Sequence, residues 1–128
     1  MFRAQPILIV EDDLLIGLGL ADAVAELDGV VIGPVATVRE ALEIVESQLV
    51  GAAILDGRLR DRDITPVALR LASMGIPLVI HTGTGLPPEV AAMRPDLPVI
   101  MKPALPLTVV LRLDDEMRSS LIATLTPQ

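Results

Sequence analysis

ILIVEDD, at residues 7–13, joins a run of four aliphatic residues directly to three acidic ones. A short apolar run is typical of a buried β-strand, and Glu11, Asp12 and Asp13 follow where that strand ends. Strands that are apolar on both sides are typical of parallel sheets covered by helices on both faces. The stretch therefore predicts a parallel sheet that carries carboxylates at the carboxyl end of one strand.

Similar apolar runs recur along the chain, and stretches with helical character separate them. Including the first run, strands are expected at 7–10, 30–32, 53–55, 78–80 and 99–101. Helices are expected at roughly 14–27, 38–48, 66–74, 88–93 and 107–125. The fourth helix is the weakest, because residues 83–98 are rich in glycine and proline. Regular alternation of strand and helix favours right-handed crossovers onto a parallel sheet, hence an α/β fold.

Three local features refine these helices. Thr37 and Thr65 stand where a side-chain oxygen caps a helix, and Pro66 then takes the first helical position. Gly17 and Gly19 fall inside the first helix, where each costs about 1 kcal/mol relative to alanine. These glycines indicate either a weak helix or close packing against a neighbour.

Length and composition restrict the function. The 128 residues fit one domain, 1–128, and leave no room for a second effector domain of ordinary size. Ten basic against 17 acidic residues give a net charge of −7, which disfavours nucleic acid and anionic membrane as partners. The chain has no cysteine, no signal-peptide core and no apolar stretch near the ~20 residues that span a bilayer. A cytoplasmic location and a protein or small-ion partner are expected.

The residues at the strand ends carry the chemistry. Glu11 and Asp12 follow the first strand, Asp56 the third, Thr82 the fourth and Lys102 the fifth. The carboxyl ends of parallel strands meet at one edge of the sheet, where sites of open α/β sheets lie. Carboxylates gathered there repel one another unless a hard cation such as Mg²⁺ binds between them.

This set of residue types suits phosphoryl transfer to a carboxylate. Asp56 can act as the nucleophile and form an acyl phosphate if the metal and Lys102 neutralise the phosphoryl oxygens. The Thr82 hydroxyl would hydrogen-bond the new phosphoryl group, and Gly83 leaves space beside it. Each feature also has a plainer interpretation: a solvated helix start for the acidic run, a turn residue for Asp56, and a surface charge for Lys102.

Taken together, the motifs resemble the receiver domain of two-component response regulators over nearly the whole chain. The matching segments are ILIVEDD, AAILDG, Thr82-Gly83 and MKP, in order and at similar spacing. Finer detail looks like the subgroup of small stand-alone regulators with a Phe-Ala-Thr-Gly type motif on the fourth strand. The resemblance implies a flavodoxin-like, doubly wound, five-stranded sheet of order 2-1-3-4-5 with helices on both faces.

The resemblance also implies roles and partners. Asp56 would accept a phosphoryl group from a sensor histidine kinase or phosphotransfer protein, with Lys102 as phosphate partner and a cis bond between Lys102 and Pro103. Mg²⁺ or Mn²⁺ would bind Asp56, Asp12, Glu11 directly or through water, and the Arg58 carbonyl. The chain would then be no enzyme beyond its own phosphorylation and dephosphorylation.

The sequence departs from the receiver pattern in the residues that transmit the signal. Val99 replaces the usual fifth-strand aromatic and the chain has no tyrosine, so a threonine-to-aromatic rotamer switch cannot operate. Ile80 and His81 replace Phe and Ala of the subgroup motif, and Thr84 follows it. We expect ordering of residues 83–98 to replace the aromatic switch. A lone strand-end histidine is more often structural than catalytic, so His81 receives no catalytic role.

Two further functions stay open. A pseudo-receiver that only binds partners would not need the aromatic that is missing here. Such proteins, however, usually lose one of the acids, the lysine or the threonine, and all of these are present. A phosphatase of the aspartyl-phosphate type is less favoured, because its second acid would stand at the position of Arg58. The sequence does not identify the kinase, the stimulus or the downstream target.

The first and last predicted helices are more apolar than one core-facing stripe requires. Their apolar residues include Leu14, Leu15, Ile16, Leu18 and Leu20 in the first and Val109, Val110, Leu111, Leu113, Leu121 and Ile122 in the last. These helices are expected either to form a homodimer surface or to dock a kinase helix, unless both are simply well buried.

Overall fold

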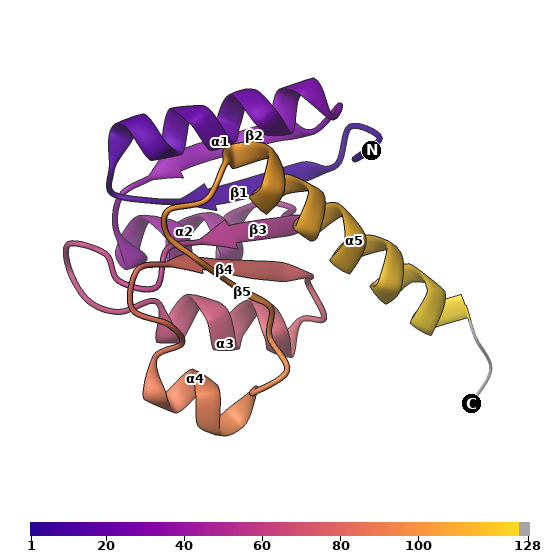
Figure 1. Cartoon of the computed structure of the whole chain (residues 1–128). Coiled ribbons are helices and arrows are strands. Elements are labelled where there is room, and N and C mark those ends of the chain that lie inside the picture. The colour runs from indigo at the N-terminus through magenta and orange to yellow at the C-terminus, as the bar shows by residue number, and fades with distance from the viewer. Residues whose placement is uncertain (126–128) are drawn as a thin grey trace.

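The computed structural model describes residues 1–125 as five parallel strands with helices on both faces of the sheet (Figure 1). The strands are β1 (Pro6–Val10), β2 (Val30–Val35), β3 (Ala52–Leu55), β4 (Leu78–Thr82) and β5 (Val99–Met101). The helices are α1 (Leu14–Glu26), α2 (Val38–Ser47), α3 (Thr65–Ser73), α4 (Pro88–Met93) and α5 (Pro106–Leu125). The strand order β2-β1-β3-β4-β5 confirms the expected flavodoxin-like topology, and α4 is short as expected.

Two aliphatic cores lie on opposite faces of the sheet. Alternate residues of the central strands point to opposite faces, so Leu8 belongs to one core and Ile9 to the other. Helices α2, α3 and α4 cover the core that contains Leu8, and α1 and α5 cover the core that contains Ile9. Both faces are covered, which explains why β1, β3 and β4 are apolar without alternation.

Two strands run two or three residues further than their apolar runs predicted, whereas β1 and β3 begin one residue earlier. β4 continues through His81 and Thr82, which pair with Ile100 and Met101 of β5. β2 continues through Gly33 and Pro34. Backbone pairing with a neighbouring strand thus extends these elements beyond the apolar residues from which they were predicted.

The helix starts confirm one predicted cap and correct another. Thr37 caps α2 by accepting a hydrogen bond from the Glu40 N–H, as expected. The prediction for Thr65 was wrong, because α3 begins at Thr65 itself after the apolar Ile64. The Asp63 carboxylate accepts from the Thr65 N–H at 3.0 Å, so a neighbouring acid satisfies the first N–H of α3.

The glycines of α1 allow close packing. A Cβ at Gly17 would lie 2.9 Å from Pro34 Cγ, closer than side chains tolerate, and one at Gly19 would lie 3.2 Å from Pro106 Cγ. Of the two interpretations of these glycines, close packing is therefore the observed one. The expected cis bond between Lys102 and Pro103 is present, as is a second one between Gly33 and Pro34. Within residues 1–125, no helix is long and apolar enough to cross a membrane.

Candidate acidic site at the carboxyl edge of the sheet

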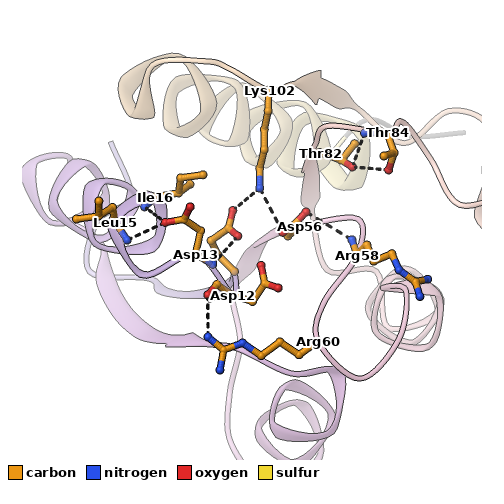
Figure 2. A network of polar contacts seen from close by, with 11 residues as sticks. Asp12, Asp13, Leu15, Ile16, Asp56, Arg58, Arg60, Thr82, Thr84 and Lys102 are labelled. Atoms are coloured by element: carbon orange, nitrogen blue, oxygen red, sulfur yellow. Dashed lines mark hydrogen bonds and ion pairs between the residues drawn. The ribbon is translucent and has the colours of Figure 1, made fainter.

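The strand-end residues that the sequence singled out meet at the carboxyl edge of the sheet (Figure 2). Glu11 and Asp12 follow β1, Asp56 follows β3, and Lys102 follows β5. The central position of β1 and β3 in the sheet brings their two ends side by side. Glu11 and Asp56 are buried, with only 3% and 8% of their surfaces exposed. Burial of two acids at one place requires a compensating cation.

Lys102 supplies one such charge. Its Nζ lies 2.8 Å from Glu11 Oε1, as an ion pair, and donates a hydrogen bond to Asp56 Oδ2 at 3.2 Å. One ammonium therefore bridges the two buried carboxylates. Figure 2 shows the Lys102 side chain reaching down from the end of β5 toward Asp56.

A third carboxylate adds the features of a cation site. Glu11, Asp12 and Asp56 each offer an oxygen within 4.8 Å of the other two. Asp12 is partly exposed, which leaves the cluster accessible from solvent. Clustered carboxylate oxygens are the ligands that Mg²⁺ and Mn²⁺ prefer. With three negative charges against one ammonium, the cluster carries an excess that a divalent cation would balance.

The titration of the cluster reflects this excess. Burial, followed by the nearby Asp56, raises the pKa of Glu11 to about 7, although Lys102 and the Asp13 N–H act in the opposite direction. Burial alone would lower the pKa of Lys102, but its hydrogen bonds and ion pairs with Glu11 and Asp56 raise it. Lys102 is therefore charged at neutral pH, while Glu11 is poised between its two forms.

Asp13 belongs to the helix start and not to the cluster. Its carboxylate accepts hydrogen bonds from the N–H groups of Leu15 and Ile16 at 3.0 and 3.2 Å (Figure 2). Such N-caps are typically worth about 1 kcal/mol. The plainer interpretation of the acidic run is thus correct for Asp13, whereas Glu11 and Asp12 reach the cluster.

Thr82 lies beside Asp56 but its hydroxyl is engaged elsewhere. Thr82 Oγ1 lies 3.3 Å from the Thr84 hydroxyl and accepts from the Thr84 N–H at 3.2 Å (Figure 2). Gly57, the residue after Asp56, makes this neighbourhood possible, because a Cβ there would lie 2.6 Å from Thr82 Oγ1. The Thr84 partnership was not predicted, although the Thr-x-Thr spacing is the signal that indicates it.

The loop between β3 and α3 encloses the cluster from the other side. The Arg58 N–H makes a long, 3.5 Å hydrogen bond to Asp56 Oδ1, which places the Arg58 backbone at the site. The Arg60 guanidinium donates to the carbonyl oxygen of Asp12 at 3.3 Å (Figure 2). The loop is thereby tied to both acidic strand ends.

The same loop is fastened to α2 by Asp61. The two Asp61 oxygens accept from the N–H groups of Val38 and Arg39 at 2.9 and 3.1 Å. These hydrogen bonds lower the pKa of Asp61, so the side chain is a carboxylate at neutral pH. Sequence reasoning missed this contact, because the capping residue lies 23 positions from the helix that it caps.

His81 lies next to the site without entering it. It is 3% exposed, and the strand alternation that places Val79 in the α1/α5 core directs His81 to the same face, away from Thr82. Burial, followed by the charge of Lys102, lowers its pKa, so the imidazole is neutral. His81 borders a cavity together with Lys102.

Solved structures share this fold over almost their full length. The solution structure of SdrG from Sphingomonas melonis is 37% identical, with a TM-score of 0.76 over 92% of this chain and 99% of that chain. A response regulator receiver protein from Sinorhizobium medicae is 19% identical, with a TM-score of 0.79 over 94% and 99%. The receiver domain of a sensor histidine kinase from Pseudomonas aeruginosa, with magnesium coordinated in its active-site cleft, is 20% identical, with a TM-score of 0.74 over 90% and 98%.

The sequence comparisons add no further relative. No protein-family model matches the chain, and no curated protein matches it significantly.

Proposed function

Because the chain belongs to the receiver-domain family of response regulators, we propose that it receives a phosphoryl group on Asp56 from a histidine kinase or phosphotransfer protein. One observation carries this proposal: Lys102 bridges Asp56 and Glu11, while Asp12 completes a cluster of three carboxylates around the same point. A carboxylate nucleophile, a cation and a metal-ligating set are the parts that phosphoryl transfer to aspartate requires.

The transfer itself is a substitution at phosphorus. A carboxylate oxygen of Asp56 forms the new P–O bond, the P–N bond to the donor's histidine breaks, and the leaving imidazole nitrogen keeps the electron pair and takes up a proton. Lys102 already lies 3.2 Å from Asp56 Oδ2 and stabilises the negative charge that the phosphoryl oxygens bring. The Thr82 hydroxyl leaves Thr84 and donates to one of those oxygens.

The residues present fit a divalent cation. Asp12 and Asp56 would bind Mg²⁺ or Mn²⁺ directly, Glu11 directly or through water, and Arg58 through its backbone carbonyl. When bound, the ion neutralises phosphoryl oxygens during transfer. The pKa of about 7 at Glu11 supports the fit, since an acid held partly protonated by burial and by the nearby Asp56 gains from a positive charge beside it.

The partner surface proposed for this function lies on α1 and α5. Three leucines of α1 next to the acidic site, Leu14, Leu15 and Leu18, are 67%, 82% and 48% exposed. Exposed apolar side chains in a group mark interaction sites more often than single ones do. We assign this face to a helix of the phosphoryl donor. Light scattering that shows a dimer dissociating on Leu15→Ser would instead identify the face as a homodimer interface.

The test is incubation of the full chain with acetyl phosphate and Mg²⁺, followed by intact mass spectrometry. The expected result is a gain of one phosphoryl group that is absent in Asp56→Asn and absent without the cation. Asp22→Asn, an exposed acid on α1, is the matched control and should be modified like the wild type.

The alternative function gives a different result. A pseudo-receiver that acts only by binding partners would gain no phosphoryl group in the wild type or in either variant. Loss of modification in Lys102→Met with retained Mg²⁺ binding would separate the role of the lysine from that of the metal ligands.

A further inference from the structure

A cavity of about 340 Å³ lies beside the acidic site, on the α1/α5 face of the sheet. Its walls are largely apolar: Leu15, Ile16 and Leu20 come from α1, and Ala104 and Pro106 come from the start of α5 and the segment before it. Figure 1 shows the beginning of α5 beside α1. The volume falls at the lower end of the roughly 300–1,000 Å³ that small-molecule sites occupy.

His81 is the polar group of this cavity and has no partner. Among residues 1–125, neither its Nδ1 nor its Nε2 forms a hydrogen bond, although both nitrogens are buried. A buried polar group without a partner is costly, so most native structures satisfy it with protein, water or ligand. Rotation of the ring about its Cβ–Cγ bond changes which ring atoms face the cavity. An occupant of the cavity would supply the missing hydrogen bond.

The charges define the chemistry of that occupant. The Lys102 ammonium is held by Glu11 and Asp56, so Lys102 lines the cavity without offering its charge. The imidazole of His81 is neutral because burial lowers its pKa, and a neutral imidazole offers one donor and one acceptor. A neutral ligand with an apolar body and one polar group matches these walls.

We propose that the cavity binds a small, neutral, mostly apolar molecule whose single hydroxyl group hydrogen-bonds to His81. The proposal goes beyond the phosphoryl chemistry and does not depend on it. The site is a property of this chain, since it is created by a histidine at the end of β4 and by Gly19, which lets α1 approach Pro106.

The test is a titration of the unphosphorylated full chain with phenol, followed by amide and imidazole NMR. Saturable shifts are expected in residues 15–20 and 102–106, together with a change at the His81 ring nitrogens. Ala104→Leu adds three carbon atoms to the cavity wall and should abolish the shifts. Ala91→Leu makes the same change on α4, outside the cavity, and should leave them unchanged.

A second pair of variants tests the hydrogen bond. His81→Leu should fold, because it removes two unpartnered buried nitrogens, and should weaken phenol binding about two- to tenfold, the range for one lost hydrogen bond. Toluene, which lacks the hydroxyl, should bind both proteins equally, and His81→Gln should retain part of the preference for phenol.

Three results would overturn the proposal. Phenol shifts that do not saturate, or that persist in Ala104→Leu, would mean that the cavity is not the site. Phenol that binds His81→Leu as tightly as the wild type would mean that the histidine takes no part. Absence of any shift, with the His81 nitrogens exchanging with water, would mean that the cavity holds solvent only.

Discussion

The hydroxyl groups of Thr82 and Thr84 lie 3.3 Å apart, so the threonine assigned to the phosphoryl group is already paired before any phosphoryl group arrives. In the proposed reaction this contact breaks when the Thr82 hydroxyl turns toward Asp56. The contact therefore favours the unphosphorylated arrangement and acts against the product by about the value of one hydrogen bond.

Removal of that contact should favour the phosphorylated form. Thr84→Val keeps the shape of the side chain and the backbone N–H that donates to Thr82, but loses the hydroxyl contact with Thr82. The phosphorylated fraction at a fixed acetyl phosphate concentration should therefore rise about two- to tenfold. Thr84→Ser keeps the hydroxyl and should match the wild type. The same fraction in both variants, measured by mass spectrometry, would mean that the contact has no influence on the equilibrium.

Glu11 should make stability depend on pH. Its pKa rises from 4.5 to about 7 on folding, so between these pH values the folded chain binds more protons than the unfolded chain does. The free energy of unfolding therefore falls as pH rises across this window and levels off above it. Glu11→Gln removes this contribution, and its stability relative to the wild type should grow with pH, by on the order of 3 kcal/mol near neutrality.

Denaturant unfolding of both proteins from pH 4.5 to 8 without divalent cations measures this difference. Parallel pH profiles of the two proteins would show that Glu11 ionises normally. Mg²⁺ should reverse the trend, because it binds the charged carboxylate: its affinity for the wild type should rise by up to about tenfold per pH unit below pH 7 and then level off.

Asp61 should influence the metal site from a distance. Its carboxylate ties the loop that carries Arg58 to the start of α2, so Asp61→Ala releases a loop that the cation requires in place. We expect a lower melting temperature and a Mg²⁺ affinity about two- to tenfold weaker, corresponding to one or two lost contacts.

Asp61→Asn keeps one acceptor and should fall between the wild type and Asp61→Ala in a calorimetric Mg²⁺ titration. Asp22→Ala is the control for loss of an exposed acid. An unchanged Mg²⁺ affinity in a destabilised Asp61→Ala protein would mean that Asp61 caps α2 without positioning the site.

Residues 83–98 should become ordered when the site carries a phosphoryl group. The segment begins at the Thr82–Thr84 contact and packs Val90 and Leu97 against the core, so a change at Thr82 reaches it directly. Beryllofluoride with Mg²⁺, which mimics a phosphoryl group on aspartate, should slow hydrogen exchange there in the wild type and leave Asp56→Asn unchanged. Identical exchange with and without the mimic would remove the hypothesis that this loop replaces the missing aromatic.

Much of the fold and site could be predicted because the decisive signals are local. A run such as Ile7 to Val10 identifies a strand by itself, and the strand-end rule then gathers Glu11, Asp12 and Asp56 at one edge. The contacts that could not be predicted join residues far apart in the chain. Asp61 caps α2, which precedes it in the chain and is separated from it by β3, so the contact joins residues 23 positions apart.

Other differences arise from competition between neighbouring groups. Thr65 is a good cap by residue type, yet its own N–H donates to the Asp63 carboxylate, and the N–H groups of Val67 and Ala68 donate to the Ile64 carbonyl instead of the Thr65 side chain. His81 is polar, but backbone pairing with Ile100 carries it into the sheet and buries it. For Thr65 a neighbouring acid overrides the preference of the single residue, and for His81 the pairing of β4 with β5 does.

Lys102 separates two sites of opposite chemistry: the acidic cluster, which attracts cations, and the cavity, whose walls are largely apolar. Its ammonium faces the first while its hydrocarbon stem borders the second. The same side chain therefore borders both the acidic site and the cavity. A ligand in the cavity would therefore contact Lys102, which pairs with Asp56, although Asp56 itself does not line the cavity.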